Sequence, residues 1–169
     1  MSGPSRPRET SKTGGTVLHD SPVITQLSGC LVPEAKDQDC RAATSGLRHP
    51  HVIVRTDSGE FRFAMGLTGQ KAADFAVIIH DRPSLVVLEM KGKSYDVSEA
   101  QEQLQNVIDV LFQRLPECRV FPAIFSNNSD PITAKMWDAR RVRVGSKSIP
   151  VQTRHCGDSI SSLHRNLSI

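Results

Sequence analysis

Several features that would fix a function class at once are missing from this sequence. No apolar run approaches the roughly 18 residues that a membrane-spanning helix needs. The opening segment MSGPSRPRET lacks the apolar core of a secretory signal, so we expect neither a signal nor a membrane span. Cys30, Cys40, Cys118 and Cys156 show none of the close spacings of zinc sites. Free thiols in a reducing cytoplasm are the simplest interpretation.

Strong charge of either sign is also missing. The 169 residues carry a formal net charge of +3, which permits a nucleic-acid partner without requiring one. Residues 1–16 are rich in Ser, Gly, Pro, Thr and Arg, and we expect them to form a disordered tail. Residues 17–169 then make a single domain, in which the stretch 17–43 has no clear pattern.

Four segments in the first half of the chain have patterns typical of strands. Residues 51–56 (HVIVRT) and 60–65 (EFRFAM) flank an Asp-Ser-Gly turn and predict a hairpin. Residues 75–79 (FAVII) and 85–89 (LVVLE) are apolar on both faces and are separated by a turn, HDRPS. We expect these two strands at the centre of a sheet with both faces covered.

A helix is expected after the second central strand. Apolar residues recur at helical spacing from Val97 to Leu115, and Pro116 ends the pattern. Ser98 and Gln101 have the spacing of an N-terminal capping box.

Strands are again expected after this helix. Residues 118–125 (CRVFPAIF) read as a buried strand, in which Pro122 favours an edge position or a bulge. Residues 141–144 and 149–152, joined by Gly-Ser-Lys-Ser, predict a hairpin, and Asp158 would cap a last helix over 159–167. The element order is β-β-β-β-α-β before this tail, so the predicted fold is α/β with a central mixed sheet flanked by helices.

Charged residues gather at one end of the predicted central hairpin. If these strands pair through a tight turn, Phe75 lies opposite Leu88 and Asp74 lies opposite Glu89. Opposed residues of an antiparallel pair point to the same side, with Cβ atoms roughly 5 Å apart. Lys91 is two residues beyond Glu89 and shares that side. Two carboxylates and one ammonium group should therefore converge.

Such a cluster suits metal-assisted chemistry on phosphates. Two carboxylates this close repel one another unless a cation lies between them, and oxygen ligands favour Mg²⁺ or Mn²⁺. The ion would polarise a phosphate oxygen and lower the pKa of a bound water. Lys91 would position that water or neutralise the transition state.

Asp74, fourteen intervening residues and then Glu89-Met90-Lys91 resemble the D-xn-ExK signature of the PD-(D/E)XK nuclease superfamily. Restriction endonucleases and archaeal-type Holliday-junction resolvases belong to it. Ala73 stands in place of the proline in the superfamily's name. The resemblance covers about residues 51–125. It implies a restriction-endonuclease-like core and Mg²⁺-dependent hydrolysis of DNA in restriction, defence or recombination, with Asp74 and Glu89 as metal ligands and Lys91 as a catalytic residue.

The resemblance suggests further site residues. Gln103 falls on the following helix, where several branches carry a glutamine that helps to orient the site. Many members add another acid from a helix upstream, and Glu34, Asp37 and Asp39 are the candidates, without a spacing rule to choose among them.

Basic residues in the second half of the chain are candidate contacts for a nucleic-acid backbone. A solvated strand edge that uses charge to block aggregation is the competing explanation for the arginine cluster. The candidates are Lys93, Arg140, Arg141, Arg143 and Lys147.

Three hypotheses follow. The first is a nuclease acting on DNA, with RNA as the alternative substrate and a second copy or a larger protein as a further partner. The second is a catalytically inactive module of the same fold that binds nucleic acid or a partner protein. The third is a small interaction protein without a nucleic-acid role.

Overall fold

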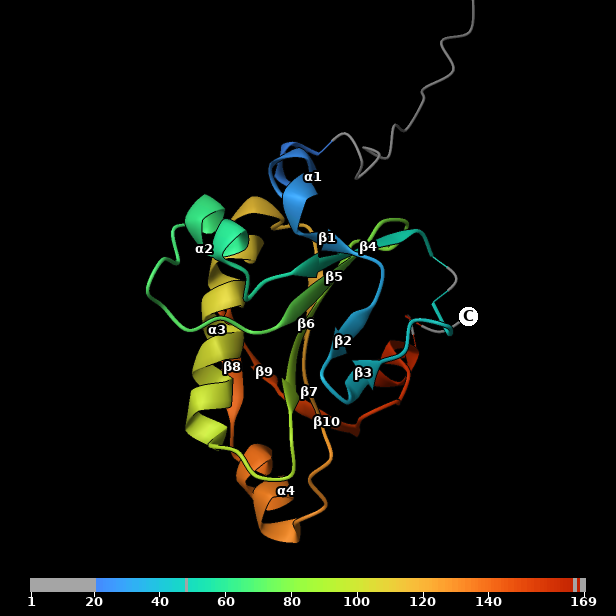
Figure 1. The fold of residues 1–169 in the computed structure, drawn as a ribbon, viewed down its shortest axis with the longest axis vertical. Helices are drawn as coiled ribbons and strands as arrows, with labels where there is room; N and C mark the ends of the chain where they lie inside the picture. The colour runs from blue at the N-terminus through green and yellow to red at the C-terminus, as the bar shows by residue number, and fades with distance from the viewer. Residues whose placement is uncertain (1–20, 48, 166, 168–169) are drawn as a thin grey trace, which may run out of the picture.

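The computed structural model describes residues 21–47, 49–165 and 167. The predicted tail, residues 1–16, lies outside these described residues. The described part is an α/β structure with four α-helices and a six-stranded central sheet (Figure 1). In chain order the elements are α1 (Pro22–Gln26), η2 (Ser28–Cys30), β1 (Leu31–Val32), β2 (Ala35–Asp37), β3 (Cys40–Ala42), β4 (His51–Arg55), α2 (Gly59–Met65), β5 (Phe75–Ile79), β6 (Ser84–Lys91), α3 (Val97–Arg114), β7 (Arg119–Ser126), α4 (Pro131–Asp138), β8 (Arg141–Val144), β9 (Lys147–Pro150), β10 (Gln152–His155) and η3 (Ile160–Leu163).

The central sheet has the strand order β1-β4-β5-β6-β7-β10. Its first half, from β1 to β6, is antiparallel, whereas β6, β7 and β10 run parallel to one another. The predicted mixed sheet is therefore confirmed. Two small two-stranded sheets, β2–β3 and β8–β9, complete the described strands.

The central hairpin β5–β6 has the register that the sequence predicts, with Phe75 paired with Leu88. Every residue of β5 is buried, as is β6 from Ser84 to Met90. A strand with apolar residues on both faces needs a cover on each side, because an exposed apolar face is unfavourable in water.

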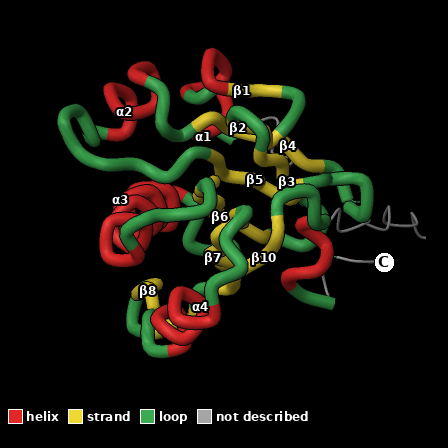
Figure 2. The backbone as a smooth tube through the Cα atoms, turned by 60° about the horizontal axis from the view of Figure 1, so that its bottom comes forward, coloured by secondary structure: helices red, strands yellow, loops and turns green. Residues whose placement is uncertain are grey.

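The two covers differ in kind (Figures 1 and 2). Helix α3 lies on one face, where Leu104 and Ile108 pack against Ala76 and Val87. The β2–β3 hairpin and the C-terminal η3 lie on the other face, where side chains such as Ile160 pack with even-numbered residues of β6. Each fully buried Leu or Ile contributes about 1.5–3 kcal/mol, so the α3 face carries much of the fold's stability.

The predicted strand at residues 60–65 is wrong, because α2 occupies Gly59–Met65. The Ser58 side chain accepts a hydrogen bond from the Phe61 N–H and caps the helix, and Gly66 ends it in a left-handed conformation, with φ 73°. Phe61 and Met65 are four residues apart and both buried. This spacing fits the period of a helix as well as it fits the two-residue alternation that predicted a strand. The predicted hairpin with residues 51–56 is therefore also wrong, and β4 pairs with β1 and β5 instead.

The predicted long helix is confirmed as α3, which ends at Arg114 before Pro116. Its cap differs from the prediction. The Asp96 side chain, two residues before Ser98, accepts the hydrogen bond from the Glu99 N–H. Asp and Ser both cap well, so the choice between neighbouring candidates depends on where the chain leaves the sheet.

Strand β7 is not at an edge, contrary to one expectation from Pro122, because β6 and β10 flank it. However, β10 pairs with β7 only from Ala123 onward. Pro122 pairs with Val87 of β6 and precedes that second ladder. The missing N–H of proline is thus tolerated where β7 has one strand neighbour in the described part.

The C-terminal hairpin exists as β8–β9, but its turn is Gly145-Ser146, shorter than predicted. Gly145 has φ 60°, which suits glycine in a two-residue hairpin turn. Gln152, placed in this hairpin by the prediction, instead begins β10 and joins the central sheet. The predicted last helix is one turn of 3-10 helix, Ile160–Leu163, capped by Ser159 rather than Asp158.

The expectation of four free thiols is wrong for two of them. Cys40 and Cys156 form a disulfide with a Cα–Cα distance of 4.9 Å, whereas Cys30 and Cys118 are free and buried. The pair is 116 residues apart in sequence. Their meeting depends on β3 lying against the end of β10, where the Gly157 N–H donates to the Arg41 carbonyl. Sequence spacing does not reveal such a contact.

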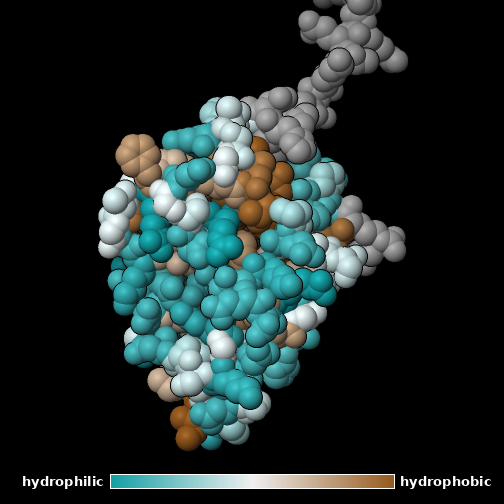
Figure 3. Space-filling view, in the orientation of Figure 1, coloured by the Kyte–Doolittle hydropathy of each residue, from teal (hydrophilic) through white to brown (hydrophobic). Residues whose placement is uncertain are grey.

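The face shown in Figure 3 is largely hydrophilic. Four large apolar side chains in the described part are exposed, namely Leu31, Phe63, Ile132 and Met136. No helix among the described residues is both long and apolar enough to cross a membrane.

Candidate active site

The central hairpin positions the predicted acidic pair. Asp74 lies directly before β5, next to the Phe75–Leu88 pair, so Glu89 is its neighbour on β6. The Met90 N–H donates to Asp74 Oδ2 over 2.8 Å. The Asp74 N–H donates to Glu89 Oε2 over 3.1 Å. These two bonds tie the Asp74 carboxylate to the backbone of β6 and the Glu89 carboxylate to the entry of β5, at one end of the hairpin.

Lys91 and Gln103 complete the same cluster. Residues of β6 alternate between faces, and Val87 packs under α3, so Glu89 and Lys91 also face α3. Lys91 Nζ lies 2.9 Å from Glu89 Oε1 and donates to Gln103 Oε1, also over 2.9 Å. The Gln103 backbone carbonyl accepts from the Ala73 N–H, which ties α3 to the entry of β5. All four predicted site residues are therefore connected.

Burial makes this cluster electrostatically unusual. Asp74 is 7% exposed and Glu89 is 2% exposed. Burial raises the pKa of Asp74, and the charge of Glu89 raises it further, against the hydrogen bond from Met90. Burial also raises the pKa of Glu89, against the hydrogen bond and charge of Lys91. The pair therefore retains protons more strongly than free carboxyls do, until a further positive charge arrives.

Asp57 is a neighbour that the sequence reasoning missed. It follows β4, and its charge raises the pKa of both Asp74 and Glu89. Arg55 donates to Asp57 Oδ1 over 2.8 Å and to Asp37 Oδ1 over 3.2 Å. The only available signal was an acid in a turn after a predicted strand, which is a common turn residue and so indicates little.

The three candidate upstream acids occupy different places. Asp37, at the end of β2, contacts Arg55, and its charge also acts on Asp74. Asp39 and Lys91 both line a cavity of about 240 Å³. Glu34 lies 3.7 Å from Arg41, with both side chains more than half exposed. Asp37 is thus the candidate acid that is electrostatically linked to the site, although it lies on a strand rather than a helix.

The basic candidates do not gather at the site. Gln101 and Gln105 of α3 bind the backbone of β8 at Arg141 and Arg143. Gln103 is two residues from each, about 200° around the helix, and faces Lys91. The arginine cluster therefore lies on the other side of α3 from the acidic pair. Lys93 is exposed and close to Lys91 in the chain, and its carbonyl accepts from Asn128 Nδ2 over 2.6 Å.

In the described part of the chain, no group of three or more His, Cys, Asp or Glu side chains is arranged to hold a metal ion. The acidic cluster itself contributes two carboxylates, so a metal ion there would take its other ligands from water or phosphate.

Comparison of the chain with protein-family models, with curated proteins and with solved structures found no match. The resemblance to PD-(D/E)XK nucleases therefore stays a prediction.

Proposed function

We propose that this protein is a metal-dependent nuclease with a restriction-endonuclease-like core, which hydrolyses phosphodiester bonds of DNA. One observation carries the proposal: Asp74, Glu89, Lys91 and Gln103, spaced as in the D-xn-ExK signature, form one connected and largely buried cluster. A buried charged cluster contributes little to stability because desolvation offsets the attraction between its charges. A role in chemistry accounts for it better.

Asp74 and Glu89 would hold Mg²⁺ or Mn²⁺. The donor set fits, because hard divalent cations prefer carboxylate oxygens, and burial together with neighbouring negative charges raises the pKa of both groups. When bound, the ion would supply Lewis acidity to a phosphate oxygen and lower the pKa of its water. In the described structure, Lys91 already supplies one positive charge to Glu89.

Lys91 would act on the reacting phosphate. Its ammonium group has three N–H donors, and Glu89 and Gln103 accept from two of them. The remaining donor is available to position the attacking water or to neutralise charge on the phosphate. Gln103 would be a positioning residue, since it holds Nζ from the α3 side.

The wider role is inferred from the superfamily. Restriction, defence or recombination in the cytoplasm would fit, with RNA as the alternative substrate and a second copy or larger protein as a partner. A reducing cytoplasm would oppose the Cys40–Cys156 disulfide.

The test is cleavage of supercoiled plasmid DNA with Mg²⁺ or Mn²⁺ and with EDTA. We expect metal-dependent nicking that Glu89→Gln and Lys91→Ala each reduce by about 10²–10⁴-fold. The matched controls are Glu102→Gln and Lys71→Ala, which remove an exposed ion pair of 3.9 Å in place of the buried one. Equal activity in the buried-pair and exposed-pair variants would remove the proposal.

The inactive nucleic-acid-binding module has one observation in its favour. Backbone N–H groups and Lys91 already engage three of the four carboxylate oxygens of Asp74 and Glu89. DNA retention that needs no metal, without cleavage under any metal condition, would favour this second function.

A further inference from the structure

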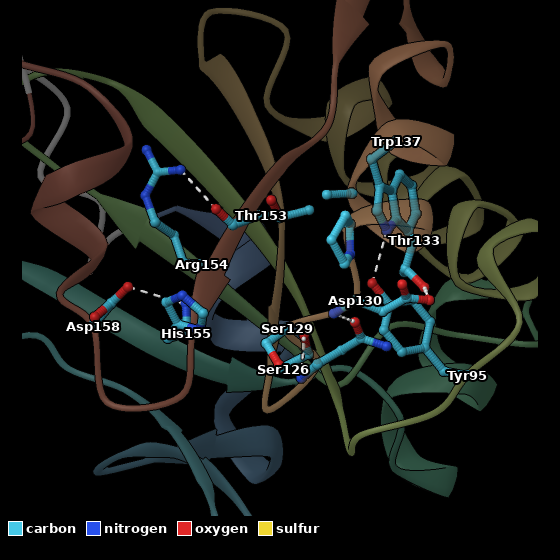
Figure 4. A pocket seen from close by; sticks show the side chains of 13 residues that line it. Tyr95, Ser126, Ser129, Asp130, Thr133, Trp137, Thr153, Arg154, His155 and Asp158 are labelled. Atoms are coloured by element: carbon cyan, nitrogen blue, oxygen red, sulfur yellow. Dashed lines mark hydrogen bonds between the residues drawn. The ribbon is translucent and has the colours of Figure 1, made fainter.

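A second polar cavity lies at the same end of the sheet as Lys91. The parallel strands β6, β7 and β10 finish together, and their register places Lys91 beside Ser126 and Ser126 beside His155. A pocket of about 370 Å³ opens between the ends of β7 and β10 and helix α4 (Figure 4). Carboxyl ends of parallel strands are where α/β proteins commonly bind ligands.

One wall of this pocket is aromatic. Trp137 is 3% exposed, and its indole N–H donates to the Tyr95 hydroxyl over 2.8 Å. This bond fixes the half-exposed Tyr95 at the pocket wall (Figure 4). A fixed aromatic ring beside a cavity is a surface on which a planar group can stack.

The opposite wall is made of small polar groups. Ser126 is 5% exposed, and its hydroxyl accepts from the Asn128 N–H over 3.3 Å. Ser129, Thr153 and the exposed His155 also line the cavity. Hydroxyl groups both donate and accept hydrogen bonds, so this wall can bind either edge of a base or a sugar without selecting one base.

The charges in this pocket disfavour a phosphate group. Asp130 and Asp158 both line it, and they accept hydrogen bonds from the N–H groups of Ile132 and His155. Arg154 also lines the pocket, but its guanidinium is engaged by the Thr153 carbonyl, Ser162 and Gln152. The two carboxylates repel an anion, and the one guanidinium among the lining residues is already engaged by these partners. The pocket therefore fits the neutral part of a nucleotide.

The neighbouring site fits the charged part. Adjacent strands are about 4.8 Å apart, so Lys91 lies one strand spacing from Ser126 and two strand spacings from His155. Val87, Glu89 and Lys91 face α3, and parallel register partners share a face. Ser126 and His155 therefore open on the same side of the sheet as Lys91. A polynucleotide with a phosphate at Lys91 would bring its next base or sugar to this pocket.

We infer that the pocket between β7, β10 and α4 binds the base and sugar of one unpaired nucleotide, and that single-stranded or locally unpaired nucleic acid is the substrate class. The inference rests on the proposed function for the phosphate at Lys91. A paired base cannot enter such a cavity without leaving its stack, whereas an unpaired base enters directly.

The test measures binding apart from cleavage. Fluorescein-labelled DNA of about 12 nucleotides, its duplex and the RNA of the same sequence are titrated by fluorescence anisotropy in EDTA. The pocket variants are Ala134→Glu, at an exposed lining position of α4, and His155→Ala. The matched control is Ala139→Glu, which adds the same charge at an exposed position outside the pocket. Circular dichroism and thermal melting verify that each variant folds.

We expect tighter binding of the single strand than of the duplex, and a loss of about tenfold in Ala134→Glu relative to Ala139→Glu. DNA and RNA arms then distinguish the two sugars. Equal affinity for single strand and duplex, or equal affinity of the two Glu variants, would overturn the inference while plasmid cleavage still tests the nuclease separately. If the pocket variants lose single-strand binding but no metal supports cleavage, the pocket stands and the nuclease proposal falls.

Discussion

Helix α3 presents glutamines on two sides, and the two sides do different work. On one side, Gln103 accepts from Lys91 and so belongs to the buried acidic cluster. On the other, Gln105 accepts from the N–H of Arg143 and donates to its carbonyl, as a neighbouring strand would. The same residue type thus serves either a site or a strand edge. The role of each glutamine depends on the side of the helix on which it lies, and the 3.6-residue period sets that side.

The largest expected difference between the two sides is in catalysis. Gln103→Ala should lower kcat for cleavage by about 10–100-fold with little change in KM, because Lys91 loses the group that orients it. Gln103→Glu, which keeps an acceptor for Nζ, should retain more activity than Gln103→Ala. Gln105→Ala should leave cleavage unchanged, and an equal loss in both Ala variants would show that α3 acts only as a scaffold.

The reverse difference is expected in stability. Gln105→Ala leaves the N–H and carbonyl of Arg143 without their side-chain partner and should lower the free energy of unfolding by about 1–2 kcal/mol. Urea unfolding measures this value. A smaller loss than that of Gln101→Ala would show that the β8 edge depends mainly on Gln101, which binds Arg141.

The pH dependence of stability separates the two sides further. Burial raises the folded pKa of Asp74 above its unfolded value of about 4. The folded protein therefore binds more protons above that pH, so in EDTA its stability should fall as pH rises from about 4 through the raised pKa. Asp74→Asn removes the Asp74 contribution and leaves that of Glu89, whose pKa is also raised, so the slope becomes smaller, and melting temperatures across pH measure it. Asp109→Asn, at an exposed carboxyl bonded to Gln105, is the control, and a slope equal to that of Asp74→Asn would contradict the assignment.

The smallest effect is expected from the arginine hairpin. Arg141 and Arg143 are exposed but lie across α3 from Lys91. Replacing both with Gln should change the slope of log affinity against log salt by less than about 1, since each phosphate contact contributes about 0.9. A change near 2 would place β8 in the path of the substrate and so remove the functional contrast between the two sides.

The central hairpin was predictable from the sequence because its information is local. Phe75 and Leu88 pair as expected, since two short apolar runs and a tight turn permit few registers. Lys91 followed from spacing along β6, whereas Gln103 came from the resemblance to the nuclease signature. By contrast, Phe61 and Met65 fit both a strand and a helix in a window of seven residues, and only the Ser58 and Gly66 caps decide. Asp57 and the Cys40–Cys156 pair depend on tertiary contacts that no spacing encodes.

The Cys40–Cys156 disulfide encloses the whole acidic cluster in one covalent loop. Between its two cysteines the chain runs through all the strands and the helix that carry Asp74, Glu89, Lys91 and Gln103. Closing a loop of this length restricts the unfolded chain by roughly 5 kcal/mol in the chain-entropy view. The disulfide also links the β2–β3 hairpin, which carries Asp37, to the end of β10 beside the pocket that α4 borders. Reduction of this disulfide is therefore expected to loosen the acidic cluster and this pocket together, while the side chains of both remain unchanged.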